Sequence, residues 1–557
     1  MKTRKKFLVF LLPFFAFFLM QKRVSAATEQ HLVKETEDYH IEWIVQEEDK
    51  GKGSVRVGDY YASSDAVELE VPETVGDLTV TRLADDAFAG GFDSIVQVTL
   101  PETVTSIGTR SFAGCTALRR VSLSSKLTSI GNEAFADCES LDRIFLPSAL
   151  KSIGTGAFAR TALKAVRLSS ENSKFRVTDG ILYDEKGTAL LCYPPGKADE
   201  SCRIPEGCVR VAREAFAGSK NLVRVFVPDT LTTLEEEAFA DCTSLSYCRI
   251  SAALTSIGAG AFRGTAVSRF IVDGKNKRLK SRDGVLLGNG ELVAYPPQKD
   301  AAAYTLPEEV TVIGRDAFRG NPYLEQLTLP EGLNWIGEGA FSHCSALQSV
   351  SVPSTVSELG AKAFADCSSL TQVRFHPASE IDSIYEDTFR DCSALEQISL
   401  PAGVTYVGLY AFAGCAKLTD VTLPDGLVMI AEGAFAHCQS LQSMALPRTV
   451  ETIGKEAFTD ELNKLQVYYD TPAWRWALRH GVEAEILKEP IEVAERTDSQ
   501  SLIMKVQEAL NELGYNCGKP DGKIGRKTRA AIAAFRKDCG LEEAEEIDRA
   551  LLDALGL

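Results

Sequence analysis

One residue type recurs at a nearly constant interval through most of the chain, and this interval limits the possible folds. Phenylalanine, each time after a small residue, recurs about every 23 residues, with two wider gaps of 58 and 56 residues. The series consists of Phe88, Phe112, Phe135, Phe158, Phe216, Phe239, Phe262, Phe318, Phe341, Phe364, Phe389, Phe412, Phe435 and Phe458. A fixed period of roughly 20–50 residues predicts a solenoid of stacked, similar units.

Each unit contains two apolar segments and then the phenylalanine. A representative unit runs Leu-Glu-Gln-Ile-Ser-Leu-Pro (395–401), Val-Thr-Tyr-Val-Gly (404–408) and Ala-Phe-Ala-Gly-Cys (411–415). We expect the first segment to form a short strand with its apolar side chains inward and the second to begin another strand. The ring of Phe412 would then fill the interior of the coil. One unit can cover its apolar edge only by stacking on the next, at the ~4.8 Å separation of parallel strands.

This unit, written L-x-x-V-x-L-P, V-x-x-I-G and A-F-x-x-C, resembles the BspA-type leucine-rich repeat proteins of bacterial surfaces over residues 53–487. The resemblance implies a mainly β leucine-rich-repeat solenoid of 23-residue coils. It also implies an adhesin or a binder of host proteins, because members of that family look like such proteins.

The two wide gaps hold sequences that are similar to each other. Residues 175–197 and 279–299 each contain an Asp-Gly pair followed by Tyr-Pro-Pro. Asp-Gly is a favoured hairpin turn, so we predict a β-hairpin insertion in each gap, with Asp-Gly as its turn or as the start of a strand. Hairpins interrupt the array in the same way in the family that this chain resembles.

Further boundaries follow from these patterns. We predict an N-terminal capping unit over residues 27–85 and the solenoid with a C-terminal cap over residues 86–487. That cap contains a last strand and a helix with Trp474 and Trp476. Because a solenoid must cover its ends to avoid an exposed sheet edge, packing of the two tryptophans within the cap is favoured over a sugar-binding platform.

The C-terminal residues follow a different pattern. Residues 488–500 are charged and aperiodic, which predicts a linker, and residues 501–557 predict a small three-helix domain. Its string V-Q-x-x-L-N-x-L-G-Y, D-G-x-x-G-x-x-T and A-I-x-A-F resembles the peptidoglycan-binding domain at the ends of bacterial wall hydrolases. The predicted wall-binding residues are Asp521, Gly522, Gly525, Thr528, Lys519, Arg526 and Lys527. In the alternative interpretation, the Asp-Gly pair and the nearby Thr serve only as loop and helix-cap chemistry.

This module contains a basic run, whereas the chain as a whole is acidic. The net charge of −17, from 60 Lys and Arg against 77 Asp and Glu, argues against nucleic-acid binding because phosphate contacts need a basic footprint. From Lys519 to Lys537 there are seven basic residues against one acid, Asp521. Anionic wall polymers or stem-peptide carboxylates would be attracted there; a solvated helix face is the alternative.

The N-terminus has the pattern of a secretory signal peptide over residues 1–26. A basic start precedes the apolar run Phe7–Met20 and the small residues at 24–26. As a helix this run rises only ~21 Å, short of a hydrocarbon core of roughly 30 Å, so we expect cleavage rather than a permanent anchor. We expect no transmembrane span after cleavage, and an extracellular location on a bacterial cell wall or surface.

Motifs of catalysis and metal binding are absent from the sequence. It contains no G-x-S-x-G, no H-E-x-x-H and no P-loop lysine motif. His343 and His437 share a repeat position but lie four coils apart, which is ~19 Å and too far to share one zinc ion. We therefore expect no enzyme, no metal and no cofactor.

Eight of the 14 cysteines follow a repeat phenylalanine by three residues: Cys115, Cys138, Cys242, Cys344, Cys367, Cys392, Cys415 and Cys438. Five of them stand in consecutive coils, an odd number that cannot pair off internally. The same register elsewhere holds the small polar residues Thr161, Ser219, Thr265 and Asn321. We predict a ladder of buried free thiols. The sequence leaves open the pairing of Cys192, Cys202, Cys208, Cys517 and Cys539.

Outward side chains of the first strands form columns on the solvent face. In the first half of the array these columns contain Arg120, Arg143, Phe145, Arg167, Arg224, Phe226, Tyr247, Arg249 and Arg269, whereas the second half has mostly Gln, Ser and Thr. Planar guanidinium groups suit carboxylate or sulfate, and aromatic rings supply contact area. We predict that an anionic ligand, either a protein or a glycan, docks here. In the alternative, these residues only cover and solubilise the sheet, with the hairpins packed over the aromatic rings.

Together these features indicate an exported, wall-associated, non-catalytic binding protein. It would be an adhesin, or a binder of a host or matrix ligand, displayed by a peptidoglycan-binding module. The alternatives are a structural wall spacer and an accessory to a cell-wall hydrolase.

Overall fold

The computed structural model describes residues 29–557 apart from residues 37, 91, 459–461, 470, 488–498, 540, 542–546, 548 and 556. It divides into two compact units, Met1–Glu485 and Ile486–Leu557. The predicted signal peptide and residues 488–498 of the predicted linker lie outside the described residues. Among the described residues, no helix is both long enough and apolar enough to cross a membrane.

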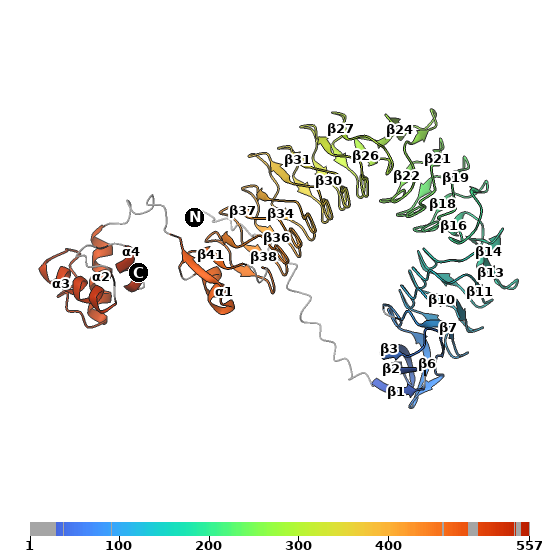
Figure 1. The fold of residues 1–557 in the computed structure, drawn as a ribbon, viewed down its shortest axis with the longest axis horizontal. Helices are drawn as coiled ribbons and strands as arrows, with labels where there is room; N and C mark the ends of the chain where they lie inside the picture. The colour runs from blue at the N-terminus through green and yellow to red at the C-terminus, as the bar shows by residue number, and fades with distance from the viewer. Residues whose placement is uncertain are drawn as a thin grey trace, which may run out of the picture. The chain divides into compact units, whose positions relative to one another are not determined.

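The first unit is the predicted solenoid, and each regular coil supplies a first and a second strand to two parallel ladders (Figure 1). The first strands are β4 (Val67–Glu70), β7 (Ile95–Thr99), β9 (Arg120–Ser122), β11 (Ile144–Leu146), β13 (Val166–Leu168), β17 (Ser201–Arg203), β19 (Arg224–Phe226), β21 (Tyr247–Ile250), β23 (Ile271–Val272), β27 (Ala303–Thr305), β29 (Gln326–Thr328), β31 (Ser349–Val352), β33 (Gln372–Phe375), β35 (Gln397–Ser399), β37 (Asp420–Thr422), β39 (Ser443–Ala445) and β41 (Lys464–Val467).

The second strands are shorter, because the chain turns toward the phenylalanine after two residues. They are β8 (Ser106–Ile107), β10 (Ser129–Ile130), β12 (Ser152–Ile153), β18 (Arg210–Val211), β20 (Thr233–Leu234), β22 (Ser256–Ile257), β28 (Val312–Ile313), β30 (Trp335–Ile336), β32 (Glu358–Leu359), β34 (Ser383–Ile384), β36 (Tyr406–Val407), β38 (Met429–Ile430) and β40 (Thr452–Ile453).

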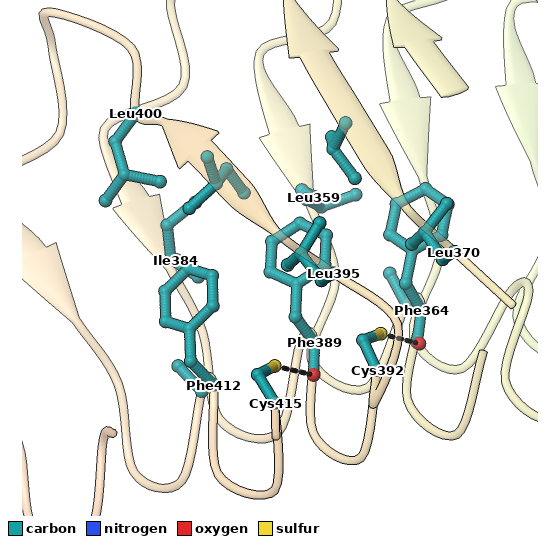
Figure 2. Packing of buried hydrophobic residues seen from close by; sticks show 14 of the residues in the cluster. Leu359, Phe364, Leu370, Ile384, Phe389, Cys392, Leu395, Leu400, Phe412 and Cys415 are labelled. Atoms are coloured by element: carbon teal, nitrogen blue, oxygen red, sulfur yellow. Dashed lines mark hydrogen bonds between the residues drawn. The ribbon is translucent and has the colours of Figure 1, made fainter. Parts of the chain in front are cut away.

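The repeat phenylalanines form the predicted column inside the coils. Within each uninterrupted run of coils, neighbouring rings lie 4.7–5.8 Å apart between centroids, and most are nearly parallel. All fourteen rings are buried. Figure 2 shows Phe364, Phe389 and Phe412 in line, with the side chains of Leu359, Leu370, Ile384, Leu395 and Leu400 around them. The ring spacing follows the strand spacing, so each ring is covered by the ring of the next coil.

The eight predicted ladder thiols are buried and free, and each has a hydrogen-bond partner. The Sγ of each donates to the carbonyl oxygen of the phenylalanine one coil earlier, at 3.1–3.3 Å. Figure 2 shows this bond for Cys392 and Cys415. The other six cysteines, including the five whose pairing the sequence leaves open, are also free thiols in the structure.

Aromatic side chains from other elements close both ends of the column. At the N-terminal end, β1 (Glu29–Glu35), β2 (Tyr39–Asp49) and β3 (Lys52–Ala62) form an antiparallel sheet, followed by β5 (Thr74–Val75) and β6 (Leu78–Leu83). Trp43 of β2 meets Phe88 edge-on at 5.9 Å. At the other end, Trp476 of α1 (Pro472–His480) meets Phe458 edge-on at 5.3 Å, and β42 (Glu483–Ile486) follows. Trp474 and Trp476 thus pack in the cap.

Both wide gaps contain the predicted hairpins. The strands are β14 (Phe175–Thr178) with β15 (Ile181–Asp184), and β24 (Leu279–Arg282) with β25 (Val285–Gly288). Asp-Gly is the turn in both, with positive φ at Asp179, Gly180, Asp283 and Gly284, as a two-residue type I′ turn requires. A third strand then returns to the second-strand ladder: β16 (Ala189–Cys192) pairs with β18, and β26 (Glu291–Ala294) pairs with β28.

The Tyr-Pro-Pro-x-Lys segment after each hairpin has two structural roles. Its lysine reaches back to the turn: the Nζ of Lys197 lies 3.2 Å from Asp179, and that of Lys299 lies 2.9 Å from Asp283. Its tyrosine takes the phenylalanine place, because the rings of Tyr193 and Phe216 lie 4.9 Å apart, and those of Tyr295 and Phe318 lie 4.7 Å apart. The sequence prediction missed these tyrosines, although each stands 23 residues before the next phenylalanine.

The second unit is a three-helix module formed by α2 (Ser499–Glu512), α3 (Arg526–Asp538) and α4 (Arg549–Leu555). The predicted linker is therefore two residues too long, since Ser499 and Gln500 belong to α2. The module has its own small core, which includes Val506, Ile532 and Phe535.

The ladder thiols give a prediction about pH and reactivity. Burial raises the pKa of Cys242 and Cys344 from an ordinary 9.0 to about 12. The folded pKa exceeds the unfolded one, so the stabilisation is complete below pH 9 and falls as the pH rises toward 12. The free energy of unfolding should therefore decrease above pH 9 in denaturant titrations. At pH 7.5, iodoacetamide should label the exposed Cys539 and spare the ladder; labelling of Cys344 at the same rate would contradict the prediction.

Candidate functional site

The solvent face of one first-strand sheet holds the main cluster of predicted ligand residues. This sheet consists of β17, β19, β21 and β23, which lie between the two hairpin insertions in the chain. The parallel register sets Arg224 beside Tyr247, and Arg249 beside Ile271. Because strand side chains alternate between faces, the intervening residues Val225 and Cys248 point into the core.

These side chains surround a shallow, open depression of about 480 Å³. Its lining consists of Arg224, Phe226, Ser246, Tyr247, Cys248, Ser268, Arg269 and Ile271. Four predicted residues, Arg224, Phe226, Tyr247 and Arg269, are thus brought together. Phe226 and Ile271 are 37% and 40% exposed, so the depression offers apolar area between two guanidinium groups.

The arginines in and beside the depression differ in whether a carboxylate of the protein already pairs with them. Among the described residues, no carboxylate forms an ion pair with Arg224 or Arg269. Arg249, in contrast, donates to Asp273. The pKa of Asp273 is lowered, mainly by a hydrogen bond from the backbone N–H of Lys275 and further by Arg249. Arg224 and Arg269 are therefore the cations that an anionic ligand could neutralise without competition from a carboxylate.

The other predicted ligand residues lie outside this depression. Arg120 belongs to the sheet β4–β7–β9, while Phe145 and Arg167 belong to the two-stranded sheet β11–β13. The first hairpin ends that ladder, since the N–H of Val166 donates to the carbonyl oxygen of Gly180 in the turn. The Arg143 guanidinium pairs with the neighbouring Asp142 at 2.9 Å. The single long column that the sequence predicts is thus divided by the first insertion.

Arg203 is a residue at this site that the sequence prediction missed. It lies beside Phe226 in the register of β17 and β19, and its guanidinium sits 4.8 Å from the centroid of the Phe226 ring. This is cation–π geometry. The available signal was that Ser201-Cys202-Arg203 precedes Arg224-Val225-Phe226 by 23 residues with the same alternation of outward and inward residues.

A second depression has a volume of about 160 Å³, and its lining has a structural role rather than the character of a binding site. Several of its lining charges are paired with one another: Glu236 meets Arg213 at 3.5 Å and Arg315 at 3.3 Å, while Arg315 also meets Glu338 at 3.0 Å. Glu236 precedes the second insertion and Arg315 follows it, so these pairs join coils across the insertion. Among the described residues, no group of three or more His, Cys, Asp or Glu side chains is positioned to hold a metal ion.

In the C-terminal module, the predicted wall-binding loop is organised by Gln507, a buried residue of α2. Its side-chain oxygen accepts from the N–H groups of Asp521 and Gly522, both at 3.0 Å. Its Nε2 donates to Asp521 Oδ1, to the carbonyl oxygen of Lys523 and to Thr528 Oγ1, at 3.0–3.1 Å. Asp521, Gly522 and Thr528 therefore help to fix the loop, which is the loop role of the structural alternative, but none of them caps α3. Gly525 precedes α3 and provides no side-chain cap.

The basic residues of this loop and helix are mostly exposed. Lys519, Arg526 and Lys527 are all exposed, so they can contact a ligand. Arg536, which contributes to the basic run in the sequence, is only 1% exposed and lies inside the module. The predicted residues thus separate into loop residues held by Gln507, of which Gly522 and Thr528 are buried, and an exposed cationic surface.

The fold and these surfaces define a class, a leucine-rich-repeat solenoid that carries a separate helical module. The family described as BspA type leucine rich repeat region matches residues 60–178, 198–282, 298–384 and 376–470, in six copies. The chain belongs to this family. Residues 499–555 match a second family, described as putative peptidoglycan binding domain.

Several solved structures are similar to this chain. A leucine-rich repeat protein from Eubacterium ventriosum is 18% identical, with a TM-score of 0.40 over 85% of this chain and 99% of that one. A leucine rich cell surface protein from Faecalibacterium prausnitzii is 24% identical, with a TM-score of 0.36 over 74% and 94%. The pneumococcal vaccine antigen PcpA is 21% identical, with a TM-score of 0.35 over 83% and 100%. No curated protein matches the chain.

The Gln507 network gives a prediction about the module. Gln507→Leu should lower its free energy of unfolding by about 1–3 kcal/mol, because the buried N–H of Gly522 loses its acceptor. Amide hydrogen exchange at Gly522 should accelerate accordingly. Glu508→Gln, an exposed change on the same helix, is the control and should have no effect beyond about 0.5 kcal/mol. Unchanged exchange in Gln507→Leu would show that the network does not hold the loop.

Proposed function

We propose that the protein is exported, is held on a bacterial cell wall by residues 501–557, and binds an anionic ligand on the first-strand sheet without catalysis. In this role it acts as an adhesin or as a binder of a host or matrix molecule. The match to a putative peptidoglycan binding domain supports the anchoring part of the proposal. Leucine-rich repeats that present an exposed sheet face support the binding part.

The observation that carries the binding proposal is the arrangement of Arg224, Tyr247 and Arg269 around the depression. The three residues stand at the same position in consecutive coils, so the two arginines are separated by roughly 10 Å, twice the strand spacing. A flat or apolar part of a ligand can rest on Tyr247 and Phe226 between the two cations. Carboxylate or sulfate groups at that separation would then complete the contact.

The alternative role is a structural spacer, which would place different requirements on the surface residues. A spacer needs only a folded array, so it places no requirement on the outward residues of β19, β21 and β23. Two arginines that have no carboxylate partner among the described residues lie beside the exposed Phe226 and the partly exposed Tyr247, and this favours a binding face over a spacer. An accessory to a wall hydrolase would need the anchor but not this face.

Anchoring can be tested with purified peptidoglycan sacculi. The full chain should sediment with sacculi, whereas a chain ending at Lys488 should stay in the supernatant, because the module is a separate compact unit. Arg526→Gln with Lys527→Gln should reduce sedimentation, and this loss should be largest at low salt. Lys505→Gln, which removes one exposed positive charge on α2 outside the loop, serves as the control and should cause no comparable loss. Equal sedimentation of the truncated chain would remove the anchoring proposal.

Ligand binding can be tested with an immobilised sulfated glycan as the anionic probe. Arg224→Gln and Arg269→Gln should each weaken binding of the glycan about five- to tenfold. Addition of 0.5 M salt should weaken its binding to the wild-type protein to a similar extent. Arg143→Gln is the control, because that guanidinium is already paired with Asp142 outside the depression. If Arg143→Gln weakens binding as much as Arg224→Gln, the site is not the depression. If no arginine variant changes binding, the spacer role is favoured.

A further inference from the structure

Six largely apolar side chains form an exposed group on the second strands of three consecutive coils and on the residues next to those strands. We name this group the tyrosine patch, and it consists of Tyr385, Tyr406, Leu409, Tyr410, Val428 and Met429. Five of these side chains are 36–41% exposed, and Tyr406 is partly exposed. The register aligns Ser383 with Tyr406 and Tyr406 with Met429, so the coils present the group as one surface.

The repeat itself shows that the fold does not require these residues. The position of Tyr406 and Met429, six residues before the repeat phenylalanine, is Ser or Thr in seven other coils: Ser106, Ser129, Ser152, Thr233, Ser256, Ser383 and Thr452. Those coils form the same second strand with the same pairing. The large apolar side chains therefore serve a purpose other than formation of the coil.

Tyr410 differs from its counterparts in side-chain chemistry, not in backbone conformation. Its φ is +51°, and the same position, two residues before the repeat phenylalanine, also has a positive φ in the other coils, so this conformation belongs to the repeat. Four coils have glycine there, and the other non-glycine residues are all charged: Asp86, Arg110, Glu133, Glu214, Glu237, Asp316, Lys362, Asp387 and Glu456. This coil instead presents a tyrosine that is 41% exposed.

The patch is surrounded by acidic residues. Glu358, Asp382, Glu386, Glu432 and Glu451 are all exposed on the second segments of these coils and of the coils on either side. Lys455 is also nearby, and its Nζ lies 3.1 Å from Glu456. An apolar surface with a negative rim is complementary to an apolar surface with a positive rim.

We propose that the tyrosine patch is a docking surface for a protein segment that carries apolar side chains beside lysine or arginine. Met, Tyr and other apolar side chains are typical of the centre of protein interfaces. Leu409, Val428 and Met429 offer no hydrogen bonds to sugar hydroxyls, which argues for a protein partner rather than a glycan. The patch lies on second strands and has an acidic rim, so it is distinct from the arginine-lined depression and does not depend on the function proposed there.

The full chain can be tested with two labelled probes of equal length by fluorescence anisotropy. One is an 18-residue amphipathic peptide of leucine and lysine, and the other has glutamate in place of lysine. The lysine peptide should bind, and the double variant Tyr406→Ser, Met429→Thr should bind it at least tenfold more weakly. Because Ser and Thr occupy this position in other coils, the variant retains the fold. Asp382→Asn with Glu432→Gln should also weaken binding and reduce its salt dependence.

The control is Trp335→Thr, which removes a large apolar side chain at the same repeat position outside the patch and should leave the affinity unchanged. Equal binding of the two peptides would overturn the choice of a cationic partner. Wild-type affinity in the Tyr406→Ser, Met429→Thr variant would overturn the site. Stronger binding of a neutral oligosaccharide, lost in that same variant, would assign the patch to a glycan instead.

Discussion

The rest of this structure depends on the stacking of one aromatic ring per coil. A coil cannot bury its own phenylalanine, and the ring is covered only when the next coil places another ring 4.7–5.8 Å away. The separation of parallel strands sets this distance. The thiol three residues later obeys the same geometry, because it donates to the carbonyl oxygen of the preceding phenylalanine. A small donor at that position thus links two coils through a second hydrogen bond to a carbonyl oxygen that also accepts from a backbone N–H of its own coil, as Phe389 does from Cys392.

The hairpin insertions alter this stacking locally and thereby create the candidate site. After each hairpin, Tyr193 or Tyr295 maintains the ring column. The hairpin turn, however, interrupts the pairing of first strands: the carbonyl oxygen of Gly180 accepts from Val166 of β13, and that of Gly284 accepts from Phe270, just before β23. The first-strand ladder therefore ends at each insertion. The four strands between the insertions become a separate face, and the arginine-lined depression lies on it.

The sequence predicted the features that repeat and missed those that depend on contacts between unlike segments. The phenylalanine column and the thiol ladder follow from spacing, because every coil repeats the same chemistry, and the two hairpins follow from the turn preference of Asp-Gly. The division of the arginine column was missed, since only the structure shows where the turn at Gly180 meets Val166. Arg203 was missed because its strand lacks the leucines of the repeat. The role of Gln507 depends on five hydrogen bonds to a loop 14–21 residues away, which no local pattern shows.

In a repeat protein, departures from the consensus carry more information about function than the consensus does. Interior positions are fixed by stacking, whereas an outward position is free to vary unless a partner selects it. The basic depression and the acidic-rimmed tyrosine patch are both such departures, on first strands and on second strands respectively. Their opposite charge means that the two surfaces favour ligand groups of opposite charge. An array of otherwise similar coils can therefore offer two chemically distinct surfaces without any change to its core.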